Sequence, residues 1–145
     1  MMAGSYVLVL RLASNRSISI GHVGQRVLPA GRYMYCGSAL GPGGLSSRLA
    51  RHRRPEKRLH WHIDYFLEHA AIEGIWVINA QTRLECAVAR SLCDLGCVPI
   101  AGVGASDCRC VGHLLLSTNA LDLDTFGAAL HARDASAPLP QLWVT

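Results

Sequence analysis

Apolar residues recur along the chain at two spacings, and the two spacings predict two kinds of element. Short runs of aliphatic, β-branched and aromatic residues, some alternating with polar ones, predict β-strands. Five segments fit this description: residues 6–11, 17–21, 32–38, 75–79 and 113–117. We therefore expect a sheet of several short strands.

Between these runs, apolar residues recur three or four positions apart, which is the spacing of one helical face. The stripes are Leu45, Leu49 and His52 in residues 45–53, and Ile63, Phe66, Leu67 and Ala70 in residues 61–70. Two further helices are expected, one that begins at Thr82 and Glu85 and runs to about Leu95, and one over residues 124–132.

Turn and capping residues mark where these helices begin and end. The Gly-Pro-Gly-Gly sequence of residues 41–44 separates the third strand from the first helix, and Pro55 cannot continue that helix. Thr82 and Glu85 form a Thr-x-x-Glu pattern, which predicts a capping box at the start of the third helix. Gly96 is a stop signal for the same helix.

The elements follow the order strand, strand, strand, helix, helix, strand, helix, strand, helix. This order predicts an α/β chain of the α+β class, with a small, largely antiparallel sheet flanked by helices. A chain of 145 residues fits one domain, which we place at residues 1–133. Residues 134–140 are rich in Ala, Ser and Pro, so we expect residues 134–145 to form a C-terminal tail.

The composition excludes several classes of protein. Hydrophobic residues make up 50% of the chain and charged residues 17%, which favours a packed core over disorder. No apolar run approaches the roughly 20 residues that span a bilayer, and the first run is a poor signal peptide. Six cysteines are too few for a disulfide scaffold. We therefore expect a cytoplasmic protein with reduced thiols and no membrane partner.

The positive charge is concentrated in residues 48–58. This segment contains six cations and one anion, whereas the whole chain has a formal net charge of +4. A local basic patch suits a polyanion such as DNA. The residues that we predict to contact nucleic acid are Arg51, Arg53, Arg54, Lys57, Arg58 and His62. The alternative interpretation of the segment is a solvated helix end.

Residues suited to phosphodiester hydrolysis lie around the glycine-rich segment. The strand that carries Tyr35 opens into it, and the next helix carries Arg48 and His52, four residues apart and therefore on one face. Helical side chains lean toward the N-terminus, so this face points back to the loop. A guanidinium there can bind a phosphate through two N–H groups. A divalent metal ion could supply several of the remaining requirements of hydrolysis.

The order of these residues resembles the signature of the GIY-YIG endonuclease superfamily. The matching pieces are Gly4-Ser5-Tyr6, Tyr35-Cys36-Gly37, Arg48 with His52, and Glu85 on a later helix. The stretches GRYMYCGSA, WHIDY and SDCRCVGHL are similar to a poorly characterised branch of the superfamily, found alone or fused to DNA-repair glycosylases. The resemblance covers roughly residues 4–116 and rests on the ordered set, because each piece alone is weak.

The resemblance implies a GIY-YIG nuclease-like fold and a metal-dependent endonuclease that hydrolyses DNA phosphodiester bonds. It implies that Tyr6 and Tyr35 lie on neighbouring strands and that one of them acts as general base or orients the attacking water. It further implies that Arg48 stabilises the phosphoryl group and that His52 assists as hydrogen-bond partner or base. Glu85 would bind one Mg²⁺ or Mn²⁺ ion. The association of the branch with DNA repair implies branched or damaged DNA as the substrate.

The sequence also leaves alternatives open. Tyr35 follows Tyr6 by 29 positions, which is longer than the usual link in the superfamily, so we expect the strand over residues 17–21 to fill the gap. The capping box alone would explain Glu85. A catalytically inactive nucleic-acid-binding module would use the same basic segment. Separately, Cys108, Cys110 and His113 have the donor atoms of a zinc site, although a structural site needs a fourth ligand.

Overall fold

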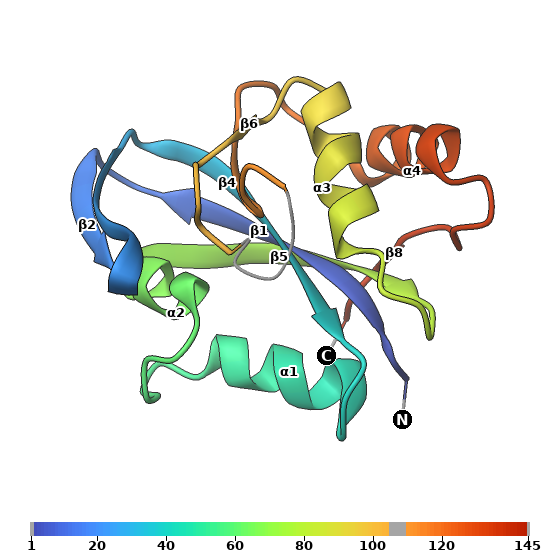
Figure 1. The fold of residues 1–145 in the computed structure, drawn as a ribbon, viewed down its shortest axis with the longest axis horizontal. Helices are drawn as coiled ribbons and strands as arrows, with labels where there is room; N and C mark the ends of the chain where they lie inside the picture. Colours follow the sequence, from blue (N-terminus) through green and yellow to red (C-terminus); the bar gives the residue numbers. More distant parts are fainter. Residues whose placement is uncertain (1, 105–109, 145) are drawn as a thin grey trace.

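One six-stranded antiparallel sheet lies between two layers of helices (Figure 1). The computed structural model describes residues 2–104 and 110–144. The elements over these residues are β1 (Gly4–Leu12), β2 (Arg16–Ile20), β3 (Gly24–Leu28), β4 (Gly31–Ala39), α1 (Gly44–Arg53), α2 (His62–Leu67), β5 (Ala70–Asn79), α3 (Glu85–Asp94), β6 (Val98–Pro99), β7 (Leu114–Ser117), α4 (Leu123–Arg133) and β8 (Gln141–Leu142). The order in the sheet is β6-β7-β4-β1-β5-β8. The predicted α+β class is confirmed.

Strand β1 lies at the centre of the sheet, and its side chains alternate between the two faces, as in any strand. Tyr6, Leu8 and Leu10 belong to one core cluster, whereas Val7 and Val9 belong to the other. All five are at most 2% exposed. Strand β1 is therefore an unbroken apolar run in the sequence because helices cover both of its faces.

Each helix layer buries apolar side chains against one face of the sheet, and the residues of the predicted stripes that are buried lie in the α1–α2 layer. Helices α1 and α2 cover the face of Tyr6 with Leu45, Leu49, Ile63 and Phe66. Helices α3 and α4 cover the opposite face with Val88, Leu92, Phe126 and Leu130. The ring of Phe126 also stacks on Trp76 of β5, with ring centroids 5.2 Å apart. The core therefore has two parts, separated by the sheet.

A separate hairpin of β2 and β3 fills the long gap between β1 and β4 (Figure 1). The strand predicted over residues 17–21 is confirmed as β2, but its partner β3 was missed. Strand β3 reads Gly-Gln-Arg-Val-Leu, and only Leu28 of it is buried, so its apolar alternation is weak. The hairpin adds Ile18, Ile20 and Leu28 to the core under α1 and α2.

Several predicted boundaries were wrong. Helix α2 ends at Leu67, and Ala70, which we had placed on its inner stripe, is the first residue of β5. Strand β5 is longer than predicted because it pairs with all of β1, with one register shift between Val9 and Leu10. The short strands β6 and β8 were not predicted. Strand β8 returns the C-terminal segment to the sheet, where it pairs with β5.

The predicted capping box of Thr82 and Glu85 is also wrong. Helix α3 begins at Glu85 itself, with Leu84 as the N-cap residue and no side-chain cap. Glu85 is therefore the first helical residue, two positions before the one whose side chain bonds back to the cap in a capping box, and its carboxylate contacts Arg83 and His113 instead. A capping box therefore does not explain the presence of Glu85.

None of the helices in residues 2–104 and 110–144 combines the length and the apolar character needed to cross a bilayer.

Candidate active site

Tyr6 and Tyr35 lie on neighbouring strands and on the same face of the sheet, as predicted. Strands β1 and β4 are paired so that Tyr6 lies opposite Gly37, and Leu8 lies opposite Tyr35. The ring of Tyr6 packs over Gly37 so closely that a Cβ atom on Gly37 would lie 2.5 Å from Cζ of Tyr6. Glycine is therefore required at this position by the approach of the tyrosine ring rather than by its own backbone angles.

His52 joins the two tyrosines from helix α1. Its Nε2 atom lies 2.7 Å from Oη of Tyr6 in a buried hydrogen bond, whose direction depends on the tautomer of the ring. The ring of Tyr35 meets His52 edge-on, with centroids 6.2 Å apart. His52 is 2% exposed. Its other nitrogen, Nδ1, has no hydrogen-bond partner within residues 2–104 and 110–144.

Burial holds all three of these rings in their neutral forms. Burial raises the pKa of Tyr6 well above its ordinary value, and the positive charge of Arg48 opposes this only in part. Burial likewise raises the pKa of Tyr35. For His52, burial lowers the pKa to about 3, although the nearby carboxylate of Asp64 acts in the opposite direction. At neutral pH the site therefore holds two phenols and a neutral imidazole.

Arg48 lies beside these rings, one helical turn before His52. Its Nη1 atom donates a hydrogen bond to the carbonyl oxygen of Ser38, at 2.9 Å. Its guanidinium also lies over the ring of Trp61, 4.4 Å from the centroid. These contacts fix the position of the positive charge, while a guanidinium has five N–H groups and can bind further acceptors.

A buried ion pair holds Trp61 in place. Arg51 donates two hydrogen bonds to Asp64, both 2.9 Å long, and its guanidinium lies 4.1 Å from the centroid of the Trp61 ring. Asp64 is fully buried, and it also accepts hydrogen bonds from the backbone N–H groups of His60 and Trp61. The pair ties α1 to the start of α2. Arg51, predicted to contact nucleic acid, thus has a structural partner.

Glu85 reaches the same pocket from the other side of the sheet. The pocket has a volume of about 180 Å³. Its lining includes Tyr35, Gly37, Ser38, Arg48, Trp61, His62, Arg83, Glu85 and Gly104. One carboxylate oxygen of Glu85 contacts Arg83, and the other lies 3.6 Å from Nδ1 of His113. Partial burial raises the pKa of Glu85, but His113 and Arg83 more than offset it, so the pKa lies below its ordinary value.

The five residues predicted to carry the chemistry therefore gather in one place. Tyr35, Arg48 and Glu85 line the pocket. Tyr6 is hydrogen-bonded to His52, and the ring of His52 packs against the ring of Tyr35. Tyr33, two positions before Tyr35, does not join them, because its hydroxyl donates to the carbonyl oxygen of Pro29 and its ring packs on Phe66. The two tyrosines of β4 thus have different environments, since Tyr35 lines the pocket and Tyr33 packs in the core.

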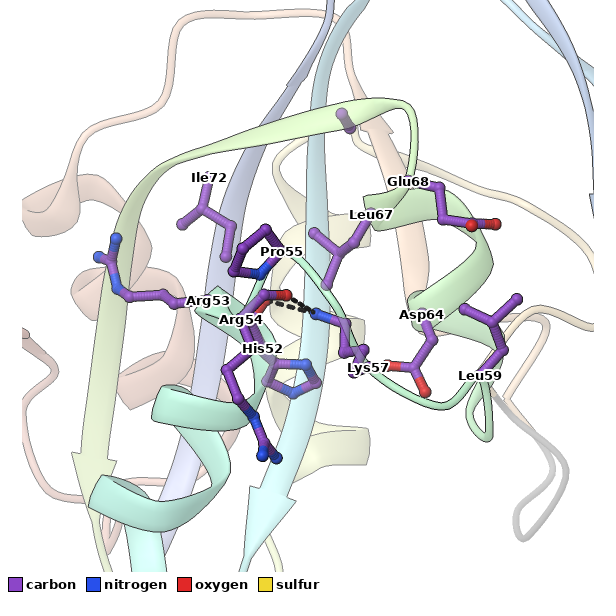
Figure 2. Close-up of a pocket in the computed structure, with 11 residues that line it drawn as sticks. His52, Arg53, Arg54, Pro55, Lys57, Leu59, Asp64, Leu67, Glu68 and Ile72 are labelled. Carbon is purple, nitrogen blue, oxygen red and sulfur yellow. Dashed lines mark hydrogen bonds between the residues drawn. The ribbon is translucent and has the colours of Figure 1, made fainter.

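The remaining predicted nucleic-acid contacts divide into two groups. Arg53, Arg54 and Arg58 are exposed. Lys57 instead caps helix α1, because its Nζ atom donates to the carbonyl oxygens of Arg51, His52 and Arg54. Figure 2 shows Lys57 turned toward the carbonyl oxygens of His52 and Arg54, in the lining of a hollow of about 320 Å³ beside the end of α1. This larger hollow shares only His52 with the five candidate residues.

His62 holds the segment that closes the far side of the pocket. Its Nδ1 atom accepts a hydrogen bond of 2.9 Å from the backbone N–H of Gly104. A Cβ atom on Gly104 would lie 3.0 Å from the ring of Tyr35, and its φ angle is +76°. This glycine lets the segment lie against the tyrosine, which nothing in the sequence indicated.

A second group of ligand atoms lies next to Glu85. Cys86, Cys110 and His113 each place one potential ligand atom within 4.8 Å of the others, so this cluster could hold a metal ion. Cys110 and His113 were predicted from the sequence. Cys108, the third residue of that prediction, lies outside the described residues. Cys86 was missed, because it is 24 positions before Cys110 and only the fold brings them together.

Comparison with known proteins places most of the chain in one family. The sequence model of the family described as "Domain of unknown function DUF123" matches residues 5–133, which include all five candidate residues. No curated protein matches the chain, and no solved structure matches it.

Proposed function

The chain belongs to the DUF123 family of unknown function, and we propose from the geometry of its pocket that it is a metal-dependent endonuclease that hydrolyses DNA phosphodiester bonds. One observation carries the proposal: Tyr35, Arg48 and Glu85, from three separate elements, line one pocket, and the hydrogen-bonded pair of Tyr6 and His52 packs against Tyr35 through the His52 ring. The resemblance to the GIY-YIG superfamily supports it, because the superfamily uses these residue types in this order.

In the proposed reaction, Arg48 binds the phosphate and stabilises its developing charge. The guanidinium is already held by Ser38 and Trp61, so little reorganisation is needed when the phosphate binds. A preorganised donor of this kind contributes on the order of 10²–10³-fold to a rate. The neighbouring Arg51 cannot replace it easily, because Asp64 engages its guanidinium through two hydrogen bonds.

Tyr35 orients the attacking water and does not deprotonate it in advance, whereas Tyr6 is bonded to His52 behind it. Their raised pKa values keep both hydroxyls protonated at neutral pH. Tyr35 lines the pocket, where its hydroxyl can hydrogen-bond the water. Behind it, neutral His52 is hydrogen-bonded to Tyr6 and packs edge-on against the ring of Tyr35, so this pair holds Tyr35 in position while the water attacks phosphorus.

Glu85 fits a hard divalent cation such as Mg²⁺ or Mn²⁺. It offers carboxylate oxygens at the wall of the pocket, and Mg²⁺ is often held by one or two carboxylates while it keeps several waters. Such an ion, when bound, makes a coordinated water more acidic and neutralises charge on the phosphate. Binding there requires the side chain of Arg83, which is 59% exposed, to move away from the carboxylate.

The exposed arginines next to α1 suit the DNA backbone on either side of the scissile phosphate. Arg53, Arg54 and Arg58 follow Arg48 along the chain and extend its positive charge over the surface. Such contacts position the duplex without reading its sequence. Branched or damaged DNA is the substrate class that the resemblance favours.

The proposal is tested by incubating the protein with Mg²⁺ or Mn²⁺ and labelled duplex, flap, bubble and single-stranded DNA. We expect cleavage of at least one structure, and a loss of at least about 100-fold in Glu85→Gln and in Arg48→Met. Tyr35→Phe should also lose activity. Matched controls are Glu73→Gln, Arg11→Met and Tyr33→Phe. Glu73 and Arg11 form an exposed ion pair with each other, and the Tyr33 hydroxyl bonds Pro29.

Two outcomes would count against the proposal. Absence of cleavage on every substrate would contradict it, and so would full activity of Glu85→Gln. Salt-sensitive DNA binding without cleavage would instead support a nucleic-acid-binding module that has lost catalysis. The observation that favours this second candidate is that Arg83 and His113 already occupy the carboxylate of Glu85.

A further inference from the structure

Three side chains with the donor atoms of a zinc site meet at the start of α3, beside the candidate active site. Cys86 is the second residue of α3, and Cys110 and His113 precede β7. Their ligand atoms lie within 4.8 Å of one another, and Sγ of Cys86 lies 3.7 Å from Nε2 of His113. We infer that these three side chains bind a thiophilic divalent cation, zinc above all.

The spacing of the ligand atoms suits tetrahedral zinc. Bond lengths of about 2.3 Å to sulfur and 2.0–2.1 Å to nitrogen place tetrahedral ligand atoms about 3.5–3.8 Å apart. The pair of Cys86 and His113 already has this separation. The widest pair needs to approach by at most about 1 Å, which a small side-chain rotation provides. These three side chains supply three of the four ligands of tetrahedral zinc.

The donor set distinguishes this ion from the one proposed at Glu85. Two thiol sulfurs and one imidazole nitrogen are soft or borderline ligands, which select zinc over magnesium or manganese. Hard cations prefer carboxylate and carbonyl oxygens. The two sites therefore take different ions, although they lie next to each other.

The backbone fixes His113 before any ion binds. The N–H of His113 donates to the carbonyl oxygen of Val103 at 2.8 Å, and its own carbonyl accepts from the N–H of Cys36 at 2.9 Å. The side chain is 2% exposed. Cys86 is equally constrained because it lies in the first turn of a helix. Two of the three ligands are thus presented by rigid elements.

Glu85 connects this cluster to the pocket. Its Oε2 atom lies 3.6 Å from Nδ1 of His113, while Nε2 of the same ring faces Cys86. Metal-bound histidines commonly donate their second N–H to a carboxylate, which fixes the tautomer and orients the ring. Glu85 is therefore a positioning residue for the zinc site, and the site in turn holds Glu85 at the pocket wall. This inference does not depend on nuclease activity.

The test is metal binding by the full chain under reducing conditions. We expect one zinc ion per chain in a competition titration with a chromophoric chelator, and a thiolate-to-cobalt absorption band when Co²⁺ is added. Cys86→Ser, Cys110→Ser and His113→Gln should each weaken zinc binding by about 100-fold or more, and Glu85→Gln by about 10–100-fold. The matched control is Cys93→Ser, an exposed cysteine on the same helix, which should bind like the parent.

Two results would show that these side chains do not form a zinc site. Binding that is equal in the parent and in Cys86→Ser would overturn the inference, as would a cobalt complex without a thiolate band. If a variant does not fold, X-ray absorption on the zinc-loaded parent decides instead: two sulfur ligands support the site, and a shell of oxygen and nitrogen alone removes it. Cleavage assays are not part of this test, so its failure would leave the proposed nuclease function standing.

Discussion

The two sides of the sheet bring different chemistry to one pocket. On the side of α1 and α2, the polar groups are buried and bonded to each other: Tyr6 with His52, and Arg51 with Asp64. On the side of α3, Glu85 is only partly buried, and its partner Arg83 is 59% exposed. The α1–α2 side is therefore a closed network, in which buried polar side chains bond to one another. The α3 side instead presents a carboxylate that a ligand can reach.

The two sides should therefore differ in what a substitution changes, which is folding stability on the α1–α2 side and reactivity on the α3 side. Buried polar groups are costly when they lose a partner, so substitutions on the α1–α2 side should lower the free energy of unfolding. Partly exposed ion pairs contribute little to stability, so substitutions at Glu85 should change function with little effect on folding. Because the α1–α2 side is preorganised, the α3 side can carry a charge that is only partly buried.

The largest effect should come from breaking the pair of Arg51 and Asp64. Asp64 is fully buried and Arg51 is 19% exposed, so Arg51→Met leaves a buried carboxylate without its partner. We expect a loss of about 3–5 kcal/mol in the free energy of unfolding, measured by urea denaturation. The control Arg53→Met, at an exposed position two residues away, should stay within about 0.5 kcal/mol. A loss below about 1 kcal/mol in Arg51→Met would show that the α1–α2 network is not a closed one.

The second effect concerns acid sensitivity. The folded pKa of His52, about 3, is lower than the value of about 6.5 in an unfolded chain. The unfolded state therefore binds more protons between these values, so stability is present above pH 6.5 and is lost as the pH falls toward 3. Between pH 6 and pH 4, we expect the parent to lose about 2–3 kcal/mol more than His52→Gln. Parallel pH curves of the two proteins would contradict burial of a neutral imidazole.

The third effect tests how closely the strands bring Tyr6 to the site. In Gly37→Ala, the added methyl group would meet the Tyr6 ring at 2.5 Å. We expect a loss of about 1–3 kcal/mol in stability and a decrease in cleavage, since Tyr6 must move. Gly74→Ala is the matched control in β5, because nothing lies within 4 Å of its Cβ position. Equal stability of the two variants would mean that the ring has room to move.

The smallest effect should be the stability change in Glu85→Gln. In metal-free protein, we expect the free energy of unfolding to change by less than about 1 kcal/mol, because the Arg83 partner is 59% exposed and solvent screens its attraction to Glu85. The same variant should lose cleavage. A loss above about 2 kcal/mol in a chelator-treated sample would place Glu85 in the structural network and end the contrast between the two sides.

The sequence predicted the layered fold because its main signals are local. The apolar run of β1, the stripe of Leu45, Leu49 and His52, and the glycines before α1 each act within a few residues. Weaker signals failed. Strand β3 has little apolar alternation, and the Thr-x-x-Glu pattern was overridden because the side chain of Glu85 has ionic partners elsewhere in the fold.

For the site, the sequence by itself supplied the five residue types and their order, and it placed Arg48 and His52 on one helical face. Only the tertiary structure decided which groups are neutral, since burial sets the pKa of Tyr6 and His52. It also decided that Arg51 pairs with Asp64 and that Cys86 meets His113. These outcomes depend on distance and solvent exclusion between segments far apart in the chain, and a linear pattern contains neither.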